Sequence, residues 1–316
     1  MTDSELPPIG KRVVVRYRLP AGYPQPLTDV IGELTATDPL TVRTADGQVV
    51  SIARDQVVAW KPLGPRPIRT SEIRSLEAAA ADGWPGMHRS WIGGWLLRAG
   101  DGYTNRANSA VPLGGTDGPA LMDTETLHRI GEWYAAHGLP AQFQLPDRLA
   151  TAPAGWRSWN ETRVLAVDIE TMALPSGPPM VRFTQDPDGA WLSMHRHRGG
   201  DAELGSTPVV DVLTAVRDGE VAFATLGLPT PLAIGRIAVT TAPDGRRWAG
   251  LTCVAVAAGH RRHGLGALVC AEIIRWGQSH GATHAYVQVS ADNDAALALY
   301  QEMGFVEHHG YRYAAP

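Results

Sequence analysis

The chain has 316 residues, enough for two or three domains of ordinary size, which excludes a single small module. Its formal net charge of -4 provides no overall field that attracts nucleic acid or an anionic membrane, so we expect neither as the main partner. The two cysteines, Cys253 and Cys270, are too few for a disulfide framework and lie in apolar surroundings, which favours buried, reduced thiols.

Short β-branched runs fill the first part of the chain, from Ile9 to Trp60. Turns rich in Pro and Gly separate four of these runs, at 12–19, 30–36, 40–44 and 48–53. This spacing predicts a small β-barrel over residues 1–66, followed by an extended proline-rich linker that begins at Lys61.

A mixed α/β pattern follows over residues 67–178. Apolar residues recur at helical spacing after Ser71, a plausible N-cap, until Gly83. Beyond this helix we expect one more helix, at 123–138, and strands at 94–99, 106–114, 141–145 and 162–170. The prolines and glycines at 174–180 then predict a second domain boundary.

The third region, residues 179–316, alternates strands and helices again. We expect strands at 191–197, 221–226, 232–239, 247–256, 283–290 and 305–314, and helices at 208–219, from the glycine loop to His280, and up to Met303. The order of elements in 67–178 roughly repeats the start of this region, a pattern that suggests a degenerate internal duplication.

The stretch HRRHGLGALV, from His260 to Val269, combines basic residues with two glycines at the start of a predicted helix. A Walker A loop is excluded because Leu265 and Gly266 stand where Lys and Ser or Thr are required. A dinucleotide fingerprint is excluded because Val269 replaces its third glycine. Backbone N–H groups at a helix start favour an anion, so the stretch predicts a pyrophosphate site built mainly from backbone.

Two motifs in order resemble the GNAT superfamily of acyl-CoA-dependent N-acyltransferases. Arg261-x-x-Gly264-x-Gly266-Ala267, after a strand ending at Val256, is similar to the superfamily's signature loop, and NDAALALYQEMGF at 293–305 is similar to its second motif. The likeness covers 191–315 well, and more loosely the rest, which resembles an actinobacterial subgroup with an SH3-like domain in front. The resemblance implies a catalytic GNAT domain over 179–316, a degenerate GNAT-like domain over 67–178 and an SH3-like barrel over 1–66.

The resemblance also implies acetyl-CoA as the acyl donor, with its pantetheine arm paired to the backbone of Val254 and Val256. The pyrophosphate would rest on backbone N–H groups of seven consecutive residues, Arg261, Arg262, His263, Gly264, Leu265, Gly266 and Ala267. The glycines matter most there because a Cβ would block the close approach of the pyrophosphate to the backbone. The side chains of the two arginines either contact the phosphates or are simply solvated on the surface.

Tyr300 matches the family's general acid, since a phenol holds its proton at neutral pH and still gives it to a forming thiolate. The alternative is a core tyrosine on an amphipathic helix. Asn293 either bonds the cofactor's amide or caps the following helix together with Asp292.

No residue stands out as the base, because Cys253 lies on the strand before the loop, where many relatives carry Glu. The remaining candidates are four carboxylates or a water held by Ser290, the carboxylates being Glu161, Asp168, Glu170 and Glu220. The scattered histidines lack the company of Cys or carboxylates that a zinc site shows, so no metal is expected. We interpret His195 and His197 as surface residues of a strand, and His308 and His309 as non-ligands.

The acceptor class is a primary amine, on either a small molecule or a protein, attacked directly on the thioester. Trp84, Trp91, Trp95, Trp156 and Trp159, and the polar stretch 106–109, fit either an acceptor pocket or the interior of their own domain. The competing function is a non-catalytic acyl-CoA sensor whose N-terminal barrel binds a partner. The N-terminal segment lacks the features of a signal peptide, and no segment reaches the roughly 18 apolar residues of a membrane span, so we expect a cytoplasmic protein.

Overall fold

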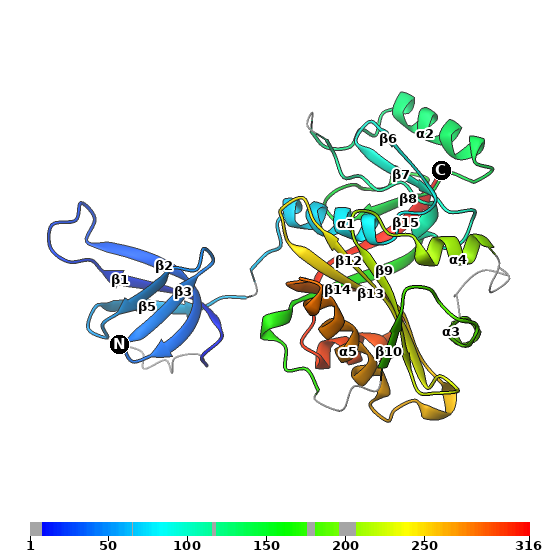
Figure 1. Ribbon diagram of the computed structural model, residues 1–316. Coiled ribbons are helices and arrows are strands. Elements are labelled where there is room, and N and C mark those ends of the chain that lie inside the picture. Colours follow the sequence, from blue (N-terminus) through cyan, green and yellow to red (C-terminus); the bar gives the residue numbers. More distant parts are fainter. Residues whose placement is uncertain (1–7, 65, 116–117, 176–180, 196–206) are drawn as a thin grey trace. The chain divides into compact units, whose positions relative to one another are not determined.

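The computed structural model (Figure 1) describes residues 8–64, 66–115, 118–175, 181–195 and 207–316, with side chains from 209 onward in the last range. The chain forms two compact units, residues 1–67 and 68–316. The predicted boundary at 178 lies outside the described residues. Each unit is considered by itself.

The first unit is a small antiparallel β domain. Its described strands pair in the order β4-β3-β2-β1-β5, with bounds β1 Arg12–Arg18, β2 Leu27–Thr37, β3 Leu40–Thr44, β4 Val49–Ile52 and β5 Val57–Pro62. Alternate residues of these strands, such as Val13 and Val15, are buried, as expected for a sheet with one covered face. The four predicted strands are confirmed, and β5 adds a fifth.

The second unit is built on one mixed sheet. Eight strands of the described chain pair in the order β10-β11-β12-β13-β14-β9-β15-β8, and β6 and β7 form a separate hairpin. The bounds are β6 His88–Ile92, β7 Trp95–Ala99, β8 Phe143–Pro146, β9 Arg157–Asp168, β10 Val181–Thr184, β11 Glu220–Leu226, β12 Ala233–Thr241, β13 Arg247–Val256, β14 His284–Ser290 and β15 Val306–Ala315.

Helices cover both faces of this sheet. Their bounds are α1 Thr70–Gly83, α2 Thr124–Ala136, α3 Gly189–Met194, α4 Thr207–Thr214, α5 Leu265–Ser279 and α6 Asp294–Glu302, with short 3-10 turns η1 Arg106–Asn108, η2 Ile169–Thr171 and η3 Ala258–His260. On β12, Ile237 lies against Gly277 of α5, whereas its neighbour Ala238 lies against Gly83 of α1. Since successive strand residues point to opposite faces, α1 and α5 pack on opposite sides.

β9 lies between β14 and β15 although it precedes both by more than a hundred residues (Figure 1). It pairs antiparallel with β14 from Asp168↔His284 to Ser290↔Thr162, and with β15 along its other edge. Strands expected to belong to a separate middle domain therefore complete the sheet of the C-terminal region. The reading of 67–178 as a degenerate GNAT-like unit stays a prediction.

Two predicted strands are wrong. The segment 106–114 forms the turn η1 and isolated bridges, because the Asn108 side chain accepts from the Gly100 and Gly102 N–H groups and holds the chain in a loop. The segment from Trp191 to Met194 is the helix α3, because Asp188 caps it by accepting from the Trp191 N–H at 2.8 Å. Both cysteines are free; Cys270 is buried as expected, whereas Cys253 is half-buried.

Candidate active site

The end of β13 separates from its parallel neighbour β14. Their pairing runs only from Trp248↔His284 to Leu251↔Val287, although β13 continues to Val256. At the same point the register with β12 shifts, and Cys253 adopts a positive φ of 55°. This bulge turns the last residues of β13, so their edge toward β14 has no strand partner in the described chain. Apart from the Val256 carbonyl, which accepts from the Arg261 side chain, the backbone along this edge can pair with an extended ligand.

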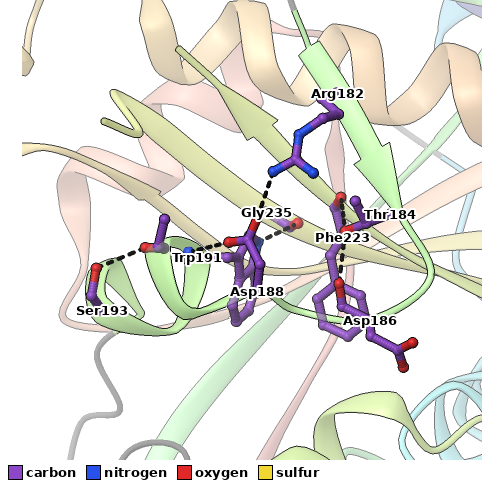
Figure 2. Close-up of polar contacts among 9 residues, drawn as sticks. Arg182, Thr184, Asp186, Asp188, Trp191, Ser193, Phe223 and Gly235 are labelled. Atoms are coloured by element: carbon purple, nitrogen blue, oxygen red, sulfur yellow. Dashed lines mark hydrogen bonds and ion pairs between the residues drawn. The ribbon is translucent and has the colours of Figure 1, made fainter. Parts of the chain in front are cut away.

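A short helix holds the bulge in place. The register shift leaves Gly235 of β12 without a paired residue on β13, and the Trp191 indole N–H donates to its carbonyl oxygen at 3.3 Å. Figure 2 shows Trp191 on α3, and Asp188 at the helix start bonded to both Trp191 and Arg182. The backbone N–H of Trp191 donates to the Asp188 carboxylate and lowers its pKa, and the hydrogen bond from the Arg182 side chain lowers this pKa further. The capped helix thereby fixes the indole against β12.

The loop after β13 presents unpaired backbone donors. Residues 258–264 are exposed, and α5 begins after Gly264, whose φ of 78° suits glycine. No side chain of the described residues caps this helix, and the N–H groups of residues 265–267 have no partner there. The positive end of a 15-residue helix therefore faces open space.

The two loop glycines differ in their surroundings. A Cβ at Gly264 would meet nothing within 4 Å, whereas one at Gly266 would lie 3.3 Å from Leu299 of α6. Arg261 folds back and donates to the Val256 carbonyl at 3.3 Å, while Arg262 and His263 are exposed. Gly264 thus keeps the space before the donors open, and Gly266 lets α5 and α6 pack closely.

The strand residues Val254 and Val256 turn their side chains toward the core beneath α5. Their backbone forms the unpaired edge described above, as a strand-like contact with a ligand requires. The residues of the expected pyrophosphate loop and of the pantetheine-binding edge are therefore contiguous in space.

Tyr300 lies in α6 and is buried, with 6% of its surface exposed. Its ring meets Phe305 edge-on with centroids 5.5 Å apart, and its hydroxyl interacts with the Cys270 thiol of α5. Burial, and then the neighbouring Cys270, raises the pKa of Tyr300 well above its ordinary value. Asn293 caps α6 by accepting from the Ala296 N–H at 3.4 Å, the capping role considered above.

Comparison with known proteins places the chain in a family. Residues 70–314 match the family described as "Probable histone acetyltransferase Rv0428c C-terminal", and residues 7–61 match "Rv0428c N-terminal Sm-like domain". The chain is 40% identical to the probable histone acetyltransferase Rv0428c of Mycobacterium tuberculosis, over 97% of this chain and 95% of the relative. The chain belongs to this family of GNAT-type acetyltransferases.

A further relative is an N-acetyltransferase by name, and a solved structure shares the fold. An uncharacterized N-acetyltransferase of Bacillus subtilis, YobR, is 28% identical over 76% of this chain and 98% of its own length. A solved GCN5-related N-acetyltransferase from Kribbella flavida has the same fold, with a TM-score of 0.51 at 20% identity, over 77% of this chain and 94% of that one. The N-terminal domain was expected to be SH3-like, whereas its family is described as Sm-like. No helix among the described residues of the acetyltransferase is long and apolar enough to cross a membrane.

Three of the four carboxylates considered as base lie at the wrong end of the sheet. The loop follows the end of β13. Glu220 lies level with the start of β13, because it pairs with Val239 of β12, which in turn pairs with Ala249 of β13. Asp168 pairs with His284 at the same far end, and Glu170 follows it. Glu161 precedes Thr162, the partner of Ser290, and thus lies at the loop end, where it is ion-paired with Arg163 at 3.4 Å.

The expectation that His195 lies on the surface of a strand is wrong. His195 ends α3, is 5% exposed, stacks on Trp191 and bonds through Nε2 to the Tyr103 hydroxyl at 2.6 Å. The N-cap signal of Asp188, three residues before Trp191, identifies this helix in the sequence. His197 lies outside the described residues. His309 is also buried, with Nε2 2.7 Å from Glu77.

Four of the five tryptophans considered for an acceptor pocket pack in the interior of the second unit. Trp84 and Trp95 are buried, Trp156 and Trp159 are half-buried against core clusters, and Trp91 is 55% exposed. A cavity of about 440 Å³ lies elsewhere, between the start of α1 and the β12–β13 turn. It is lined by residues such as Arg74 and Arg246, and it lies at the opposite end of β13 from the loop.

Proposed function

We propose that this acetyltransferase moves the acetyl group of acetyl-CoA to a primary amine by direct attack on the thioester. The observation that carries the proposal is the junction of β13 and α5. There an unpaired strand edge leads directly into a loop whose N–H groups face open space at Gly264. An extended amide-containing arm and a pyrophosphate are the two ligand features that such a junction suits.

The residues of this junction would hold the donor as follows. Backbone groups of Val254 and Val256 would pair with the pantetheine arm, and the N–H groups of residues 261–267 would bind the pyrophosphate. The exposed Arg262 and His263 side chains add positive charge beside the same anion. Asn293 caps α6, and a further bond from it to the donor's amide remains part of the proposal.

Tyr300 would act as the general acid. In the proposed step the amine nitrogen bonds to the carbonyl carbon, the carbon–sulfur bond breaks, and the Tyr300 hydroxyl gives its proton to the sulfur. The amine loses a proton to water, and a proton from solvent restores the phenol, so the products are an amide and free CoA thiol. Burial raises the pKa of Tyr300, so the hydroxyl holds its proton until a strong base forms beside it.

The acceptor is an amine of a small molecule or of a protein. The relative named a probable histone acetyltransferase supports a protein amino group. The net charge of -4 does not separate the two acceptor classes, since a negatively charged enzyme attracts a cationic small amine and a basic tail alike.

Free-thiol release from acetyl-CoA with a panel of primary amines tests the proposal. We expect amine-dependent thiol release in wild type, with the acetylated product seen by mass spectrometry. A protein that binds acetyl-CoA in calorimetry but releases no thiol with any amine would be the sensor, and the proposed function would be wrong.

A further inference from the structure

Two arginines lie against the ring of one tryptophan on the α1-facing side of the sheet. The guanidinium carbon of Arg236 is 4.6 Å, and that of Arg106 5.6 Å, from the centroid of the Trp84 ring. Arg236 comes from β12 and Arg106 from the turn η1, whereas Trp84 directly follows α1. We call Arg106, Arg236 and Trp84 the arginine cluster.

No carboxylate of the described residues forms an ion pair with Arg106 or Arg236. Arg236 is fully buried, and burial lowers its pKa to about 10. Its guanidinium donates to the carbonyl oxygens of Leu213, Gly83 and Ala215. Carbonyls satisfy its N–H groups but leave its charge uncompensated. Burying charge without an opposite charge is unfavourable, which makes an anionic ligand the natural partner.

The described chain has one buried carboxylate, and other groups already engage it. Glu77 bonds to His309 at 2.7 Å and accepts from the Gln144 amide at 2.6 Å. Gln144 in turn accepts from Arg98. Glu77 therefore belongs to a closed network beside Arg98 and does not neutralise the arginine cluster.

One buried donor of the arginine cluster, and one on the same face of the sheet, lack an acceptor. Among the described residues, Arg106 Nε and Gln288 Nε2 are buried with no hydrogen-bond partner. The Arg106 guanidinium also bonds to the Tyr311 hydroxyl, and Tyr286 is among its neighbours. Gln288 follows Tyr286 by two residues on β14, so both side chains point to the same face of the sheet. An orphaned buried donor has lost its bonds to water, so a ligand with acceptor oxygens would restore a bond at each of these two positions.

The arginine cluster adjoins the proposed transfer site. Arg236 donates to the Thr252 hydroxyl at 3.4 Å, one residue before the bulge at Cys253. Burial raises the pKa of the Cys253 thiol, and the charges of Arg236 and Arg106 act in the opposite direction, so both guanidinium groups lie within electrostatic reach of the bulge. An anion bound by the arginine cluster would therefore lie beside the open edge of β13.

We propose that the arginine cluster and Gln288 bind a carboxylate of the acceptor, so that the acceptor is an amine that also carries a carboxylate, as free amino acids do. This inference rests on the proposed function. The half-buried Arg106 supplies the guanidinium that reaches the ligand, and Arg236 supplies fixed positive charge behind it. Each orphaned donor would bond to a carboxylate oxygen in this proposal.

Initial-rate kinetics with paired acceptors test this inference. Lysine and 1,5-diaminopentane differ by one carboxylate, and O-phosphoethanolamine and ethanolamine differ by one phosphate. We expect kcat/KM of wild type to be at least about 50-fold higher for lysine than for the diamine, as one charge-assisted bidentate contact allows. The Arg106→Gln variant should lose about tenfold or more for lysine and stay within about twofold for the diamine. A preference confined to the phosphate pair would overturn the carboxylate assignment.

Two further variants guard against a purely structural effect. Gln288→Leu removes an orphaned donor, so it should lower kcat/KM for lysine without lowering the melting temperature. Arg312→Gln changes an exposed arginine of β15 next to Tyr311 and should leave both acceptors unaffected. Equal kcat/KM for both members of each pair would overturn the inference while leaving the proposed function intact.

Calorimetric titration of lysine into the enzyme separates failure of the inference from failure of the proposed function. Binding of lysine that is weakened in Arg106→Gln supports the carboxylate site even if no amine is acetylated. Absence of lysine binding, together with turnover of the diamine, would overturn the inference.

Discussion

Replacing Tyr300 by Phe removes one hydroxyl and keeps the ring, which separates the proposed proton transfer from packing. The ring stays packed on Phe305, and the lost interaction is the one with the Cys270 thiol. One hydrogen bond contributes about 0.5–1.5 kcal/mol to stability, so we expect the melting temperature to fall by about 6 °C at most. Loss of a general acid typically lowers the rate by about 100-fold to 10,000-fold.

The assay is steady-state thiol release, with acetyl-CoA affinity measured by calorimetry. We expect kcat of Tyr300→Phe to fall by about 100-fold or more while the dissociation constant for acetyl-CoA is unchanged. Tyr134→Phe is the matched control, because Tyr134 is fully buried and its hydroxyl donates to the Arg98 carbonyl at 3.1 Å, away from the loop. A folded Tyr300→Phe enzyme with wild-type kcat would refute the role of Tyr300.

Three other outcomes follow from the same structure. Because burial raises the pKa of Tyr300, kcat should not decline between pH 8 and 10; a fall with an apparent pKa near 9 would contradict the assignment. Burial also raises the pKa of Tyr286 to about 12 and that of Tyr134, so above about pH 10 these phenols keep their protons in the folded protein but lose them in the unfolded chain. Stability should therefore be unaffected below pH 10 and fall above it, by about 1.4 kcal/mol per pH unit for each tyrosine, which urea unfolding at pH 8 to 11 measures. Trp191→Phe orphans the Gly235 carbonyl and should lower the free energy of unfolding by about 1–3 kcal/mol in denaturant titration, whereas an unchanged midpoint would show that the indole does not hold the bulge.

The sequence predicts the loop and its helix well because the determinants are local. Gly264 must adopt a positive φ, and apolar residues such as Ile273 recur at helical spacing after it. The position of Asn293 before its helix likewise predicts the cap that the structure has. Such features depend on neighbours within a few residues, so a single sequence contains them.

The parts that the sequence does not predict depend on contacts between distant segments. The insertion of β9 between β14 and β15 is set by strand pairing, which apolar periodicity does not specify. The arginine cluster joins residues 84, 106 and 236 from three elements, so no spacing reveals it. One sequence feature does indicate contacts between distant segments. Gly235 and Gly250 interrupt apolar strands at positions where another side chain packs against the strand backbone, Ile273 at Gly235 and Tyr286 at Gly250.

The central claim is that the β13–α5 loop binds the acetyl-CoA pyrophosphate, and calorimetric titration of acetyl-CoA tests it most directly. Gly264→Ala and Gly245→Ala form a matched pair, because both glycines have a positive φ, 78° and 83°, and an added Cβ meets nothing within 4 Å at either. Both variants should lose about 1–2 kcal/mol of stability from backbone strain. We expect Gly264→Ala to bind acetyl-CoA about tenfold or more weakly, and Gly245→Ala, in the distant β12–β13 turn, to bind like wild type. Equal, wild-type affinity in both variants would contradict the account.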